Sequence, residues 1–463
     1  MRILLRTWLL LLCLPYFGRA QEKPNMVIII SDDHAFQAIG AYGTKLMATP
    51  NLDRIAREGA ILNRGYVTNS ICGPSRATIL TGKYSHKNGF KDNLNPSFDG
   101  SQDLFVKRLQ NAGYQTAWVG KWHLGSTPQG FDFFEILPGQ GHYYNPDFIK
   151  MDGSQVRKEG YVTNLIEDLA EDYLDKRDKS KPFCLIIGHK ATHRTWIPDT
   201  SDFRLFDQSQ FPLPANFYDQ YQTREAAKQQ DMSISKTMLL DYDLKMFSED
   251  TKDGNISRMN REQRKKFDAY YKPIHEKFKK ADLRGDSLVE WKYQRYMRDY
   301  LGTASSLDRN IGRTLDYLDK NDLSKNTIVI YLSDQGFYLG EHGWFDKRFM
   351  YEESFRTPFL IRYPEKIKAG TRIDDFVLNL DVAPTLLEAA GVSIPAEMQG
   401  KSILPLFQDK KIPFRDQIYY HYYENEEHSV SPHFGIRTDR YKLIRFYKRV
   451  EGWELFDLKK RPG

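Results

Sequence analysis

Cysteine is scarce in this sequence, and neither sign of charge is in large excess. The 463 residues include 3 cysteines, too few for a disulfide framework. Lys and Arg total 67 against 61 for Asp and Glu, a formal net charge of +6, which gives no general case for nucleic-acid binding. Beyond residue 20 no apolar run is long enough to cross a bilayer. The sequence is 40% apolar, 14% aromatic and 28% charged. This is a globular composition, and the length allows two or three domains at about 150 residues each.

The first 20 residues have the pattern of a signal peptide. Two arginines precede the apolar run Trp8–Leu14, and small residues stand three and one positions before a cleavage point after Ala20. The pattern predicts a secreted or periplasmic protein. A buried N-terminal helix fits the flanking arginines poorly, and lipid attachment at Cys13 is disfavoured by the large Leu12.

Strand-like and helix-like segments alternate along most of the chain. Buried-strand runs occupy 26–30, 183–187 and 327–332, and helical patterns occupy 51–58, 103–112, 163–175 and 296–320. The alternation predicts an α/β fold with a large, mostly parallel mixed sheet flanked by helices. We expect the catalytic domain at 21–400, with a helical insertion at 200–295. Short aromatic strands near 418–423, 434–437 and 441–446 predict a smaller C-terminal antiparallel-sheet subdomain at 401–463. The chain stops in a turn-like Arg-Pro-Gly, which leaves open whether it continues past Gly463.

Two of the predicted strands end in acidic corners. One runs into Asp32 and Asp33, and another into Asp334 and Gln335. Ligands collect at the carboxyl ends of strands in such sheets, and carboxylate and amide oxygens suit Ca²⁺ or Mg²⁺ better than Zn²⁺. The alternative is that each aspartate only caps a turn or helix.

The segment from Ser70 to Gly82 is the most informative. Pro74 suits the first helical position and Gly82 the end of the helix. Cys72 therefore stands at a helix N-terminus, with Arg76 one turn further on. A buried structural cysteine would explain Cys72 alone, but not the whole Cys-x-Pro-x-Arg pattern. In an oxidising compartment Cys72 and Cys184 would also be able to pair.

Cys72-Gly73-Pro74-Ser75-Arg76 resembles the signature of the type I sulfatases, within the alkaline phosphatase superfamily. Further matching segments extend the resemblance over residues 26 to about 445. It implies that a separate maturation enzyme oxidises Cys72 to formylglycine, whose hydrate is the nucleophile. The geminal diol can release sulfate by returning to the aldehyde, whereas a simple alkoxide would remain sulfated.

The resemblance also assigns the metal and reaction residues. Asp32, Asp33, Asp334 and Gln335 match the ligands of a divalent metal, usually Ca²⁺, which the modified Cys72 completes. Gln335 departs from the more common Asn.

Roles in the reaction follow from the same resemblance. Arg76 would hold the formylglycine hydrate, and Lys121 would bind sulfate oxygens. His123 would take the hydroxyl proton. His193 would protonate the leaving oxygen, and Lys347 would contact it. Thr192 replaces a usual proline beside His193.

The same resemblance implies that the substrate is a sulfated glycan. Segments at 136–146 and 291–297 resemble bacterial sulfatases that act on glycan sulfates, and the segment at 346–352 is similar to N-acetylglucosamine-6-sulfatases. Together they favour 6-O-sulfate on N-acetylglucosamine or glucosamine of mucin or glycosaminoglycan. Sulfate at another position, such as on galactose, is the alternative. Candidate sugar-binding residues are His142, His342, His433 and Arg437, the last two with a competing interpretation as ordinary strand residues.

Two other classes of function remain open. A phosphodiesterase or phosphonate hydrolase of the same superfamily can carry the same modified cysteine. A catalytically silent glycan-binding homologue would keep the fold without turnover, although the proposed reaction residues are all present. The Tyr- and Lys-rich stretch from Tyr270 to Tyr300 is interleaved with acidic residues, so we interpret it as a solvated helix and not as a nucleic-acid surface.

Overall fold

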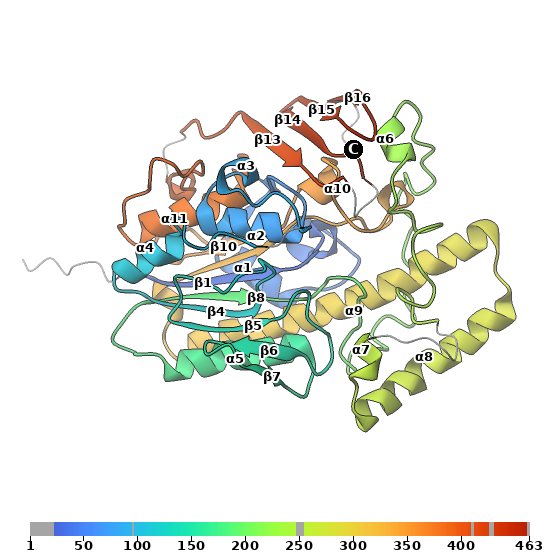
Figure 1. Ribbon diagram of the computed structural model, residues 1–463, viewed down its shortest axis with the longest axis horizontal. Helices are drawn as coiled ribbons and strands as arrows, with labels where there is room; N and C mark the ends of the chain where they lie inside the picture. Colours follow the sequence, from blue (N-terminus) through green and yellow to red (C-terminus); the bar gives the residue numbers. More distant parts are fainter. Residues whose placement is uncertain (1–22, 95–96, 247–253, 409–411, 426–429, 461–463) are drawn as a thin grey trace, which may run out of the picture.

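A 10-stranded sheet forms the centre of the protein (Figure 1). The computed structural model describes residues 23–94, 97–246, 254–408, 412–425 and 430–460, so the expected signal peptide at 1–20 lies outside the described residues. The strand order across the sheet is β11 (Thr371–Ile373), β2 (Ala60–Leu62), β10 (Phe359–Arg362), β9 (Thr327–Ser333), β1 (Asn25–Ser31), β8 (Phe183–Gly188), β4 (Gln115–Lys121), β5 (Phe133–Leu137), β6 (Asp147–Lys150) and β7 (Gln155–Arg157). Strands β9, β1, β8, β4 and β5 are parallel, and antiparallel pairings flank them. The predicted large mixed sheet is confirmed.

The apolar strands are buried because helices cover both faces of the sheet. Val27 and Ile29 of β1 point into a core shared with α1 (Pro50–Glu58), α5 (Val162–Lys176) and α9 (Gly285–Lys320). Ile28 and Ile30 point into a second core with α2 (Cys72–Thr81), α4 (Phe105–Asn111) and α11 (Val382–Ala389). Figure 1 shows the two helical layers on opposite sides. A strand buried on both faces requires the continuous apolar run seen in the sequence.

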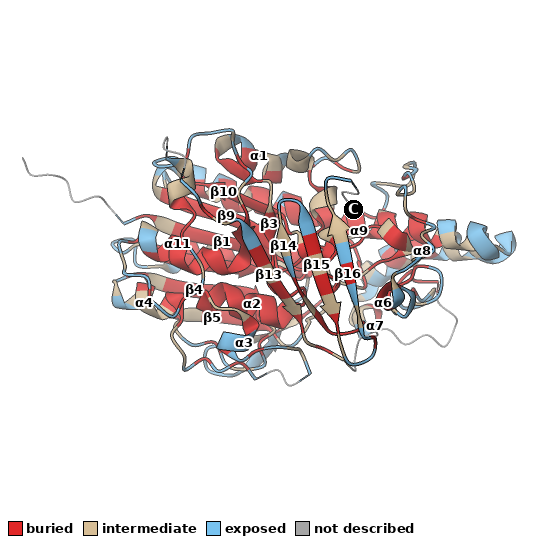
Figure 2. Ribbon diagram, turned by 90° about the horizontal axis from the view of Figure 1, so that it is seen from above, coloured by how far each residue is buried: buried red, intermediate tan, exposed pale blue. Residues whose placement is uncertain are grey.

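The C-terminal antiparallel sheet is also present. It contains β13 (Gln417–Tyr422), β14 (His433–Thr438), β15 (Tyr441–Phe446) and β16 (Gly452–Asp457), in that order. The sequence analysis did not predict β16, whose outward residues are partly exposed at the sheet edge (Figure 2). Ile403, Leu404 and Phe414 belong to the core beside α2, α4 and α11. The small sheet therefore begins at Gln417, after a segment that packs with the main body.

The segment expected as an insertion is only partly helical. It holds the short helices α6 (Glu225–Lys228) and α7 (Gly254–Ser257), then α8 (Arg261–Ala281). The continuous helix expected from Tyr270 to Tyr300 is wrong. The chain breaks between α8 and α9, where Asp282 and Gly285 have positive φ of 40° and 54°. The end of α8 beside this break is exposed (Figure 2). Residue 295 lies inside α9, which continues into the main body. In the described part of the chain, no helix has the length and apolarity needed to cross a membrane.

Candidate active site

The two acidic corners meet because β1 and β9 are parallel neighbours in register. Ser31 pairs with Ser333, so the residues that follow both strands emerge side by side. The backbone N–H of Asp33 donates to Oδ1 of Asp334 at 3.2 Å. Asp33 has φ of 64°, an uncommon backbone conformation for a residue other than glycine, and such conformations concentrate at functional sites.

Cys72 is the first residue of α2 and is 1% exposed. Its Sγ lies 3.3 Å from Oδ1 of Asp32 and 3.5 Å from Nζ of Lys347. Burial, together with the nearby Asp32 carboxylate, raises the pKa of the Cys72 thiol above its usual value. An unmodified thiol at this position is therefore neutral and is not an activated nucleophile. Cys184 lies buried in β8, and both cysteines are free.

Gly73 allows the neighbouring loops to close over the start of α2. A Cβ at this position would stand 2.6 Å from both Oδ1 of Asn93 and Cε1 of Phe90. Side chains larger than hydrogen would push these groups away. The second position of the Cys-Gly-Pro segment is thus fixed by close packing.

Three buried ion pairs surround Cys72. Lys121 pairs with Asp32. Lys347 donates to Oδ1 and Oδ2 of Asp33 at 2.5 and 2.7 Å.

The third pair joins Arg76 and Asp334. The guanidinium is 3.0 and 3.1 Å from Oδ2 of Asp334, and it also donates to the carbonyl of Lys121 at 2.9 Å. Both side chains are fully buried. The structure thus brings together the reaction cations that the sequence analysis placed far apart along the chain.

The acidic corner has the donor set of a site for a hard divalent cation. Oxygens of Asp32, Asp33 and Asp334 lie within 4.8 Å of one another. Burial and the charge of Asp32 raise the pKa of Asp334 to about 7. Burial also raises the pKa of Asp33. Oε1 of Gln335 is buried without a hydrogen-bond partner in the described protein. Crowded carboxylates and an unpartnered amide oxygen fit a bound cation.

Two histidines face this centre from loops that follow β4 and β8. Nδ1 of His123 is buried without a protein partner, and burial beside Lys121 lowers its pKa well below the usual value. Nε2 of His193 lies 3.9 Å from Oδ2 of Asp33, while Nδ1 lies 2.7 Å from the carbonyl of Arg194. Burial also lowers the pKa of His193. Both rings are neutral here. This suits a proton acceptor at His123, whereas a proton donor at His193 needs an added negative charge nearby.

Sequence analysis missed Gln140 and Lys190 beside these residues. Nζ of Lys121 donates to Oε1 of Gln140 at 2.5 Å. Nζ of Lys190 donates to the backbone carbonyl of Gln140 at 3.0 Å. Lys190 immediately follows His189 after β8, and that position was the only sequence signal available.

His142 and His342 lie apart from each other. The pKa of His142 is lowered by partial burial and by Arg258 and Lys190. This places it on the Lys190 side of the centre. His342 has Nδ1 2.6 Å from Oδ2 of Asp219.

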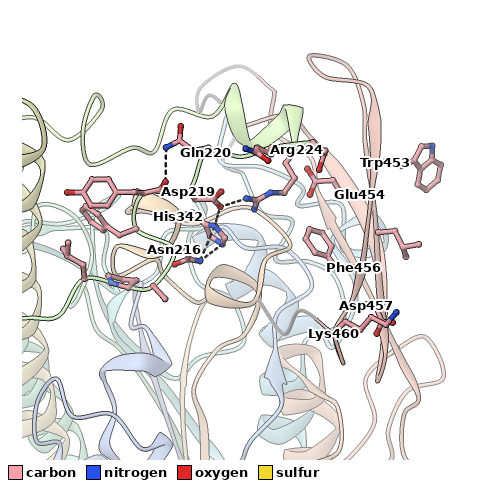
Figure 3. Close-up of a pocket in the computed structure, with 18 residues that line it drawn as sticks. Asn216, Asp219, Gln220, Arg224, His342, Trp453, Glu454, Phe456, Asp457 and Lys460 are labelled. Atoms are coloured by element: carbon pink, nitrogen blue, oxygen red, sulfur yellow. Dashed lines mark hydrogen bonds and ion pairs between the residues drawn. The ribbon is translucent and has the colours of Figure 1, made fainter.

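Asp219 and His342 line a cavity of about 1010 Å³ between the 213–224 loop and β16 (Figure 3). Arg224 pairs with Asp219 inside it, and Trp453 points away from it. The described lining includes none of the charged residues around Cys72. Polar groups of this cavity largely bond to one another.

His433 and Arg437 have structural surroundings and not those of sugar-binding residues. His433 is fully buried, its Nε2 accepts from the N–H of Met350 at 3.1 Å, and its Nδ1 lies 2.9 Å from the carbonyl of Ser431. Arg437 pairs with Glu352 at 3.0 Å and stacks on Tyr66. These contacts favour the competing interpretation of both as ordinary strand residues.

The mixed, largely parallel sheet has a buried centre that combines a nucleophile position with carboxylates and cations. These are the features of an α/β enzyme that acts on anionic esters. A family model described as Sulfatase matches residues 24–392, and one described as N-sulphoglucosamine sulphohydrolase, C-terminal, matches residues 340–463. The chain therefore belongs to the sulfatase family, whose members hydrolyse sulfuric esters, as the sequence motifs predicted.

Several individual proteins and solved structures are also similar to this chain. An N-acetylglucosamine-6-O-sulfatase of Bacteroides thetaiotaomicron is 49% identical over 95% of this chain and 82% of that protein. An N-acetylglucosamine-6-sulfatase of Capra hircus is 26% identical over 86% and 66%. A solved structure in complex with its substrate D-glucosamine-2-N,6-O-disulfate has a TM-score of 0.93 and 48% identity, covering 95% of this chain and 92% of that one. A phosphonate monoester hydrolase of Agrobacterium radiobacter, 18% identical, shares the fold, with a TM-score of 0.67 and coverage of 95% and 90%.

Proposed function

We propose that this enzyme removes the 6-O-sulfate of N-acetylglucosamine or glucosamine in mucin or glycosaminoglycan chains. The observation that carries the proposal is the 49% identity, over 95% of the chain, to a protein named for this activity. A relative 27% identical, named an ulvan-active sulfatase of Formosa agariphila, supports the alternative of a different sulfated sugar. The signal-peptide pattern at 1–20 supports secretion or a periplasmic location.

The proposed catalytic group at position 72 is formylglycine, made from Cys72 by a maturation enzyme. The buried thiol with its raised pKa supports this, because the unmodified side chain would attack poorly. A formylglycine hydrate supplies the attacking oxygen when present. Arg76, fixed between Asp334 and the Lys121 carbonyl, would hold that hydrate.

Ca²⁺ is the proposed metal, with Mg²⁺ as the alternative. Asp32, Asp33, Asp334 and Gln335 would hold it, together with the modified residue 72. The metal supplies positive charge that draws electron density from sulfate oxygens.

Proton transfers are assigned to the two histidines. His123, neutral and unpartnered at Nδ1, would accept a proton from the hydroxyl at position 72. A bound sulfate would place negative charge near His193, which raises its pKa and lets it protonate the leaving oxygen. Lys347 would stabilise that oxygen as it gains charge.

A defined experiment tests the proposal. Formylglycine at position 72 is first confirmed by peptide mass spectrometry, and that material is assayed with Ca²⁺. The panel contains N-acetylglucosamine-6-sulfate, galactose 4- and 6-sulfates, sulfated uronic-acid disaccharides and a matched phosphate ester. Selective release from N-acetylglucosamine-6-sulfate is expected. Release only from galactose sulfates contradicts the sugar assignment, and preference for the phosphate ester contradicts the sulfatase role. If fully converted protein cleaves none of these substrates, the result favours the glycan-binding alternative.

A further inference from the structure

The cations around Cys72 are matched one to one with carboxylates. Lys121 pairs with Asp32 and Lys347 with Asp33, and Arg76 pairs with Asp334 in the same way. These pairs account for all three acidic residues of the corner. The same carboxylates are the proposed metal ligands, so the charge that these three cations offer to an incoming anion depends on whether the metal is bound.

Lys190 is a buried cation of this neighbourhood without such a partner. It is 3% exposed, and its Nζ donates to the backbone carbonyl of Gln140 at 3.0 Å and lies 4.9 Å from the centre of the Tyr143 ring. Within the described ranges, no carboxylate lies within 4.0 Å of it. A buried ammonium is costly unless an anion or several acceptors satisfy it.

Other buried lysines of this protein are satisfied differently. Lys245 pairs with Asp299 at 3.0 Å and donates to three carbonyls. Lys292 donates to the carbonyls of Ser235 and Met238 at 3.1 and 2.8 Å. Lys190 has one carbonyl and a ring face, so two of its three ammonium hydrogens have no hydrogen-bond acceptor among the described residues.

Gln140 links this ammonium to the reaction centre. Its backbone carbonyl accepts from Lys190 and its side-chain Oε1 accepts from Lys121 at 2.5 Å. One residue thereby accepts hydrogen bonds from two ammonium groups. Two cations held close together favour an anion between them.

We propose that Lys190 is a further sulfate-binding residue, whose ammonium contacts an oxygen of the substrate's sulfate group alongside Lys121, with Gln140 as the positioning residue for both. The inference rests on the proposed assignment of the Cys72 centre to sulfate esters. A sulfate monoester carries one negative charge and three non-bridging oxygens. It would therefore neutralise the positive charge of Lys190, which pairs with no carboxylate in the described part of the chain. The contact involves binding alone and breaks no bond.

The electrostatics of Lys190 agree with this placement. Burial, and then the like charge of Lys121, lower the pKa of Lys190 to about 7. The titratable groups that face it are Lys121, Asp32, Asp33, Cys72 and His142. A bound anion would favour the charged ammonium, so sulfate binding is expected to weaken as pH rises above about 7.

The test compares Lys190→Met with the wild-type holoenzyme, loaded with formylglycine and Ca²⁺. Inorganic sulfate is the probe, through its inhibition constant against an aryl sulfate and through the thermal shift it produces. Loss of one charge-assisted hydrogen bond is expected to weaken sulfate binding and raise KM by about ten-fold to a hundred-fold. Lys190→Arg should recover part of the affinity. The weakening of wild-type binding above about pH 7 should be absent in Lys190→Met.

Lys292→Met is the matched control, because it removes a buried ammonium that bonds only to carbonyls. It is expected to lower stability without changing the inhibition constant. If Lys190→Met does not fold, Lys190→Gln replaces it. A folded variant that binds sulfate within two-fold of wild type overturns the inference while the proposed function stands. Wild-type protein that neither binds sulfate nor cleaves any sulfate ester overturns both.

Discussion

Lys347 holds both carboxylate oxygens of Asp33, at 2.5 and 2.7 Å, across 314 positions of sequence. The same ammonium is 3.5 Å from Sγ of Cys72. Burial opposes its charge, but Asp33 outweighs burial and raises the pKa of Lys347 above its usual value. Lys347 therefore keeps its proton throughout the working pH range, and acts as a fixed positive charge beside the nucleophile position.

Replacing Lys347 should mainly affect the reaction rate. Lys347→Met is expected to lower kcat by about a hundred-fold or more, since removing a single stabilising donor has effects of that size. The measurement is kcat on the best sulfated sugar at equal formylglycine content. Lys176→Met, at a side chain 73% exposed, is the control. A Lys347→Met enzyme with normal kcat would refute the proposed role.

Substitutions of Cys72 and of Cys184 should have different effects on turnover. Cys72→Ser protein whose serine is unmodified by mass spectrometry is expected to fold and bind substrate but to show no repeated turnover, because a simple hydroxyl cannot release sulfate by returning to an aldehyde. Cys184→Ala, in the buried strand β8, should remain active with some loss of stability from the smaller side chain. Burst and steady-state sulfate release measure both. Multiple turnovers by Cys72→Ser would contradict the mechanism.

Metal binding should depend on pH in a defined direction. Burial and Asp32 raise the pKa of Asp334 to about 7, so protons compete with the cation below that pH. The increase in Tm produced by Ca²⁺ is expected to grow from pH 5.5 to pH 7.5. Chelation should abolish activity, and added Ca²⁺ should restore it. A Ca²⁺-induced Tm shift that is equal at every pH would argue against Asp334 as a ligand.

Glu352 should contribute stability that is lost in acid. Burial opposes its ionisation, but Lys442 and Arg437 lower its pKa from 4.5 to about 2. A depressed carboxyl pKa stabilises the fold above the unfolded value, and the effect disappears as pH falls through the folded value. Its size is about 3 kcal/mol. Glu352→Gln should therefore lower the free energy of unfolding at pH 7, with a smaller difference from wild type near pH 2.5. Urea denaturation at several pH values measures this, and a pH-independent difference would contradict it.

His433 should affect stability and not substrate binding. Its two ring nitrogens bond to backbone groups inside the small sheet. His433→Ala is expected to lower stability by about 1–3 kcal/mol, because a buried N–H loses its acceptor. KM on the sulfated sugar should stay within two-fold of wild type. A large rise in KM in a folded variant would restore the sugar-binding interpretation.

The fold class and the two acidic corners of the site could be predicted from the sequence. Continuous apolar runs such as Met26–Ile30 are typical of strands buried on both faces, and polar residues that follow parallel strands are expected at one edge of the sheet. Local chemistry also placed Cys72 at a helix N-terminus and Gly82 at the helix end, although α2 begins at Cys72, two residues before the first helical position expected at Pro74.

The rest depended on contacts between distant segments. Gln140 has no local signal, since its importance comes from two lysines that only the folded sheet brings to it. His433 looked available because strand alternation cannot tell which face of the small sheet packs inward. The break at Asp282 was missed although poor helix formers, Gly285, Asp286 and Ser287, follow it.

The continuity of α9 limits how this enzyme can be rebuilt. Its 36 residues form one rod of about 54 Å, which begins beyond the sheet and ends beneath it. A chimaera that exchanges residues 200–295 with a relative would cut this rod through its first third. The two parts of α9 would then join with an uncontrolled rotation about the helix axis. The orientation of the exchanged loops on the catalytic body would therefore be uncontrolled as well. Changes of substrate range by loop exchange should therefore keep Gly285–Lys320 intact and join the new segment before Arg261, where α8 begins.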